Sequence, residues 1–207
     1  MLASTKFQEL VRFFVENIKD MPTSTHSPMI RVLATVSTQG SNVEIETGYF
    51  MELTNMLKNR LFGILHRRDF SRNFQSQEIK NDVINTLEMY EGLCLAADYN
   101  TAGTILANIY HYFDAFARIF QVYKNISEVN LYVLRVFGEI AKMMSLHEAQ
   151  LDHCKAFYTS YTSVLRNYAN SHIGVKTNFS FHNEEERFED LTVVLETLSN
   201  LILVEGK

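Results

Sequence analysis

Hydrophobic residues recur along this 207-residue chain every three to four positions, which is the spacing of one face of an α-helix. The pattern predicts eight helices, over about 5–20, 28–38, 45–67, 76–97, 101–123, 128–144, 147–168 and 184–203. The longest candidate loop covers 169–183. Ser27, Asn100 and Ser127 are expected to cap helix N-termini, because their side chains can accept a hydrogen bond from a free backbone N–H.

The expected helices pair into four antiparallel hairpins, because most of the connections between them are short. The hairpins cover 5–40, 43–97, 100–144 and 147–203, so their first helices begin 40 to 56 residues apart. The lower end of that interval matches HEAT-type repeats. We therefore expect an all-α fold, an α–α superhelix or HEAT-repeat solenoid that forms a single segment over 1–207. A compact helical bundle is the competing architecture.

The composition is consistent with a helical chain. Hydrophobic residues make up 46% of it, and it has only 8 Gly and 2 Pro to interrupt helices. No apolar run reaches the roughly 18 residues that a membrane span needs, so we expect no membrane partner. The net charge of −5 argues against nucleic acid as a partner, because binding to phosphates needs a basic face.

The acidic residues are unevenly distributed among the expected helices. The first helices of the four hairpins are each neutral, whereas the second helices together carry a charge of −7. Stacked repeats place all second helices on one surface, so this distribution predicts an acidic partner-binding surface. Its candidate residues are Glu78, Asp82, Glu184, Glu185, Glu186, Glu189 and Asp190. The alternative interpretation is that these residues favour helix N-termini, where they complement the helix dipole.

No set of residues has the spacing of an active site, so we expect no enzyme activity, no cofactor and no metal. His147 and His153 are six positions apart, whereas two metal ligands on one helical face need a spacing of four. Cys94 and Cys154 are expected to be two buried thiols, with one disulfide as the alternative.

Two further clusters have structural interpretations. The basic run His66-Arg67-Arg68 lies at the end of an expected helix, where it can complement the terminal carbonyl groups. The aromatic series of the fifth helix is expected to fill the core between packed helices. It consists of Tyr110, Tyr112, Phe113, Phe116, Phe120 and Tyr123.

A series of short motifs carries a resemblance to a known family. The motifs lie at 77–80 (QEIK), 86–88 (TLE), 92–94 (GLC), 120–125 (FQVYKN), 129–140, 184–191 (EEERFEDL) and 198–201 (LSNL). In this order they resemble nuclear export receptors of the importin-β, or karyopherin, superfamily. A weaker stretch over 7–36 extends the resemblance to nearly the whole chain. The chain looks like a piece from the second half of such a receptor.

The resemblance implies a function that composition and periodicity do not show. Exportins are long HEAT-repeat solenoids that bind Ran-GTP together with protein cargo, and they shuttle between nucleus and cytoplasm through contacts with nucleoporins. The receptors most like this chain carry the hypusine-bearing translation factor and Smad-type regulators, and they import Sox-type transcription factors. The alternative is a HEAT-like scaffold subunit that organises a cytosolic protein complex.

Overall fold

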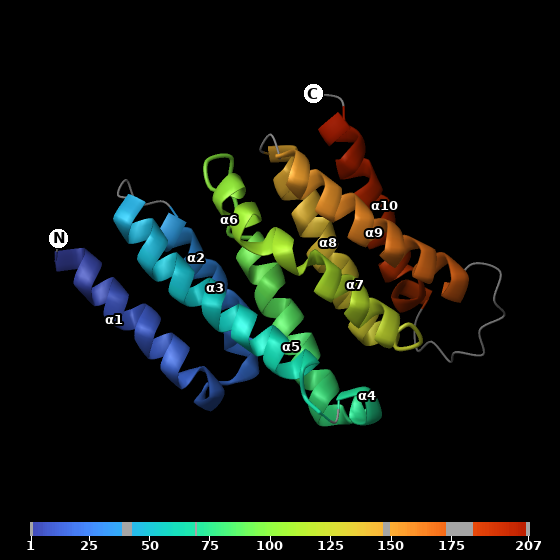
Figure 1. The fold of residues 1–207 in the computed structure, drawn as a ribbon, viewed down its shortest axis with the longest axis horizontal. Helices are drawn as coiled ribbons and strands as arrows, with labels where there is room; N and C mark the ends of the chain where they lie inside the picture. Colours follow the sequence, from blue (N-terminus) through green and yellow to red (C-terminus); the bar gives the residue numbers. More distant parts are fainter. Residues whose placement is uncertain (1, 39–42, 69, 147–149, 173–183, 206–207) are drawn as a thin grey trace. The chain divides into compact units, whose positions relative to one another are not determined.

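The computed structural model describes residues 2–38, 43–68, 70–146, 150–172 and 184–205, and every regular element in these ranges is helical (Figure 1). The all-α class is as expected. None of the described helices is long and apolar enough to cross a membrane. In chain order the α-helices are α1 (Leu2–Asn17), α2 (His26–Thr38), α3 (Val43–Leu65), α4 (Phe70–Asn73), α5 (Gln77–Cys94), α6 (Ala102–Ile109), α7 (Phe113–Val122), α8 (Ser127–Leu146), α9 (Leu151–His172) and α10 (Glu184–Glu205).

The fifth expected helix, over 101–123, is wrong as a single element. The chain instead forms α6, a 3-10 turn η3 (Tyr110–Tyr112) and α7. Residues 109–113 (IYHYF) are β-branched, aromatic or imidazole side chains, all of modest helix propensity. The Tyr110 ring lies against the His153 ring of α9 with 4.5 Å between centroids. Packing against α9 therefore accompanies the tighter turn at this point.

Two of the expected caps are also wrong. The α2 helix begins at His26, so Ser27 lies inside its first turn. The start of α6 is organised by Asp98 rather than by Asn100. The Asp98 Oδ1 atom accepts hydrogen bonds from the backbone N–H groups of Asn100 and Thr101, each at 2.9 Å. The residue that organises the start of α6 is therefore Asp98, two positions before Asn100. Its carboxylate forms a local turn before the helix.

Other boundaries differ by a few residues from the expected ones. The α8 helix begins at Ser127 itself, and Ser76 caps α5 by accepting from the Ile79 N–H at 3.4 Å. The short helix α4 was not predicted. The α9 helix continues to His172, four residues into the expected loop. The remainder of that loop, 173–183, and the expected helix start at 147–149 lie outside the described residues.

The chain divides into two compact units, Met1–Thr104 and Ile105–Lys207, called unit 1 and unit 2 below. In unit 1, α2 packs against α5 and α1 packs against α3, while α3 also contacts α2 and α5. The core between them consists of fully buried aliphatic and aromatic side chains. These include Val11, Phe14, Ile30, Leu33, Leu53, Leu57, Leu61, Val83 and Leu87.

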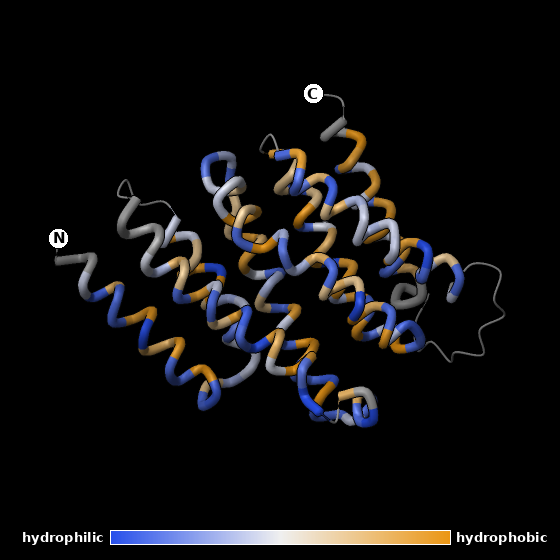
Figure 2. The backbone as a smooth tube through the Cα atoms, viewed as in Figure 1, coloured by the Kyte–Doolittle hydropathy of each residue, from blue (hydrophilic) through white to orange (hydrophobic). Residues whose placement is uncertain are grey.

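In unit 2, α8 packs against α10 and α7 packs against α9, while α7 also contacts α8. Four of the six residues of the aromatic series lie in this core as expected. Phe113, Phe116, Phe120 and Tyr123 are fully buried, and Tyr110 and Tyr112 are half-buried. Figure 2 shows hydrophobic and hydrophilic residues alternating in short blocks along each helix, as helices with one buried face require.

One buried polar residue of unit 2 gives a testable prediction. Asn130 of α8 is 2% exposed, and among the described residues neither polar atom of its side chain has a hydrogen-bond partner. Replacing it with leucine, which has a similar shape, should stabilise the protein by about 1–2 kcal/mol, because an unpaired buried amide is costly. Thermal unfolding of Asn130→Leu measures the effect. A lower melting temperature would show that the amide is satisfied in solution.

Candidate partner-binding site

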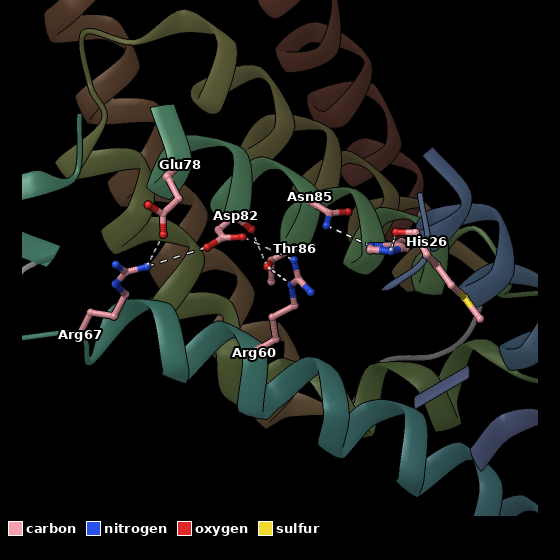
Figure 3. A network of polar contacts seen from close by, with 8 residues as sticks. His26, Arg60, Arg67, Glu78, Asp82, Asn85 and Thr86 are labelled. Atoms are coloured by element: carbon pink, nitrogen blue, oxygen red, sulfur yellow. Dashed lines mark hydrogen bonds and ion pairs between the residues drawn. The ribbon is translucent and has the colours of Figure 1, made fainter. Parts of the chain in front are cut away.

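Two of the predicted acidic residues, Glu78 and Asp82, lie in a polar network between α3 and α5 (Figure 3). The Arg67 Nη1 atom lies 3.6 Å from a Glu78 carboxylate oxygen and 4.0 Å from one of Asp82. The Arg60 Nη2 atom lies 3.7 Å from the other Asp82 oxygen. Glu78 is in the first turn of α5, as the helix-dipole interpretation requires. Both carboxylates are therefore paired with arginines of their own chain.

Arg60 is the most enclosed charged residue of the network. Its Nε donates to the Thr86 hydroxyl oxygen at 3.1 Å, and that hydroxyl donates to the Asp82 backbone carbonyl at 2.7 Å. Burial lowers the pKa of the Arg60 guanidinium, and the Asp82 charge opposes this shift. An arginine remains charged even so, which means that Asp82 offsets the cost of removing this cation from water.

A second polar contact in unit 1 fixes α2 against α5. His26 is 2% exposed, with Nε2 at 3.2 Å from the Met21 carbonyl oxygen and Nδ1 at 3.0 Å from Asn85 Nδ2 (Figure 3). A carbonyl only accepts, so Nε2 carries the proton and Nδ1 accepts from the Asn85 amide. The arrangement uses both nitrogens of a neutral ring, and its role is to hold the two helices together.

Of the acidic residues at the start of α10, the structure describes the side chains of Glu189 and Asp190 only. Glu189 forms an ion pair with Arg135 of α8 at 2.5 Å, and the Arg135 guanidinium lies 5.4 Å from the centre of the Tyr132 ring. Burial raises the pKa of Tyr168, and the neighbouring Asp190 carboxylate raises it further. Glu184, Glu185 and Glu186 form the first turn of α10, and their side chains lie outside the described residues.

The structure thus places four of the seven predicted acidic residues, Glu78, Asp82, Glu189 and Asp190, beside other groups of the chain. Glu78 and Asp82 meet arginines in unit 1, and Glu189 meets Arg135 in unit 2. Their role in binding a partner remains a prediction. The basic run was expected to complement helix carbonyls. In the structure Arg67, just after α3, makes ion pairs with Glu78 and Asp82 of α5, and the His66 ring stacks on Phe62 with 5.5 Å between centroids.

The network predicts unequal effects for two similar substitutions. Asp82→Asn should cost about 1 kcal/mol of stability, because it leaves the partly buried Arg60 without its nearest anion. Glu78→Gln should cost less than about 0.5 kcal/mol, since the Glu78 side chain is 78% exposed and its ion pair is solvent-screened. Hydrogen exchange of the α5 amides compares the two variants. Equal effects would contradict the network as described.

The described residues show no group of three or more His, Cys, Asp or Glu side chains that could hold a metal ion. His147 lies outside them, and His153 is buried against Tyr110. Both cysteines are free thiols. Cys94 is buried as expected, whereas the expectation for Cys154 is wrong because it is only half-buried.

An exposed apolar stripe on α10 is a prominent surface feature. The sequence analysis had expected most of its residues to lie in the core. Val194 and Leu201 face inward as expected. Five neighbouring large apolar residues instead face solvent: Phe188, Leu191, Leu195, Leu198 and Ile202. Their spacing of three and four was visible in the sequence. However, residue spacing alone does not show which part of a wide apolar face is buried against neighbouring helices.

Comparison with known proteins does not identify the chain. No protein-family profile matches it, and no solved structure matches it. The case for its function therefore rests on its own residues and on their arrangement.

Proposed function

We propose that this chain is a segment of a nuclear transport receptor built as a HEAT-repeat solenoid, which carries protein cargo through the nuclear pore in a Ran-GTP-dependent way. The family proposed is the exportin branch of the importin-β superfamily, and the member whose motifs it resembles is exportin-4. Its expected partners are Ran-GTP, nucleoporins and protein cargo such as the hypusine-bearing translation factor. The segment acts by binding and carries no chemistry of its own.

The packing of alternate helices is the observation that carries the proposal. In unit 1 the first and third long helices, α1 and α3, pack together, and so do α2 and α5. Unit 2 repeats the pattern, with α7 against α9 and α8 against α10. Stacked helical hairpins produce this arrangement, because equivalent helices of successive repeats lie side by side. Consecutive long helices are in contact as well, α2 with α3, α3 with α5 and α7 with α8, as helices within a hairpin and between adjoining hairpins are.

The exposed stripe on α10 gives independent support. Leu195 is 57% exposed and Ile202 is 72% exposed, although the same helix buries Val194 and Leu201. The buried face belongs to a close contact with α8, where a Cβ atom on Gly138 would meet the Thr197 hydroxyl at 3.2 Å. The exposed stripe lies next to this buried face on the surface of α10. A further helical hairpin of the receptor is the occupant that we propose for it.

Cysteine labelling tests whether the stripe is an internal interface of a longer array. With Cys154 replaced by serine, Leu195→Cys should react rapidly with a thiol reagent in the 207-residue chain and should be protected in the full-length receptor. Glu196→Cys, one position along on the exposed polar side, is the matched control and should react in both. If Leu195→Cys reacts equally in both proteins, the stripe is not covered by another repeat.

The cellular association of the full-length protein separates a receptor from a scaffold. A transport receptor should be recovered with nucleoporins and should exchange between nucleus and cytoplasm. Stable recovery with a cytosolic assembly, without nucleoporins, would favour the scaffold subunit and would overturn the proposed function.

A further inference from the structure

We draw no further inference here: the strongest candidate, the open groove of about 660 Å³ between α1 and α3 of unit 1, is lined by charged side chains of both signs together with a few apolar ones, and nothing in the structure shows what covers it.

Discussion

Phe137→Ala should destabilise unit 2 by about 3–5 kcal/mol, the cost of removing a large side chain from a packed core. Phe137 of α8 is fully buried, and its ring is surrounded by those of Phe113, Phe116, Phe157 and Tyr161. The nearest ring centroid, that of Tyr161, is 5.4 Å away. Two of these pairs, with Phe116 and Phe157, are edge-to-face, an arrangement that adds to the energy of burial alone. Truncation therefore leaves a cavity shared by three helices.

Native-state hydrogen exchange of the α8 amides measures this loss within unit 2. Phe188→Ala is the matched control in the same unit, because Phe188 is 51% exposed. It should cost less than about 1 kcal/mol. If Phe137→Ala costs as little as Phe188→Ala, the aromatic residues do not form the core described above.

Gly92→Ala should destabilise unit 1 by about 1–3 kcal/mol, although alanine is the better helix former. Gly92 lies near the end of α5, and a Cβ atom there would come within 2.6 Å of both the backbone oxygen and the hydroxyl of Ser27. These atoms belong to the first turn of α2, whose neighbour His26 is held by Asn85. The two helices must therefore separate, which weakens their shared interface.

Gly63 provides a control, because its replacement by alanine should raise the stability of the protein rather than lower it. A Cβ atom on Gly63 of α3 would meet nothing within 4 Å. Gly63→Ala should therefore stabilise the protein by about 0.5–1 kcal/mol through helix propensity alone. Urea denaturation of both variants compares them. Stabilisation by Gly92→Ala would contradict the close approach of α5 to α2.

Much of the fold could be predicted from the sequence, because helical periodicity is a local property. Most of the eight expected helices reappear in the structure, and Phe113, Phe116 and Phe120 of α7 lie in the core. The break at residues 110–112 was missed; there the Tyr110 ring packs against His153 of α9, a contact with a residue more than 40 positions away. The Asp98 turn was missed because a nearer asparagine offered an equally good cap.

The candidate site was less predictable, because it depends on which helices meet. The sequence indicated Glu78 and Asp82 as acidic surface residues, but not that Arg60 of α3 and Arg67, just after α3, would face them. The same limit applies to α10, where one apolar arc divides into a buried and an exposed part.

The coupling between cargo and Ran is the property that distinguishes a transport receptor from any other helical-repeat protein. For the function proposed here, the most direct measurement is the dissociation constant of the full-length protein for the hypusine-bearing translation factor, with and without Ran-GTP. Our account predicts that saturating Ran-GTP tightens cargo binding by about 5–150-fold, that cargo tightens Ran-GTP binding by the same factor, and that Ran-GDP has no effect. An identical cargo affinity under all three conditions would contradict it.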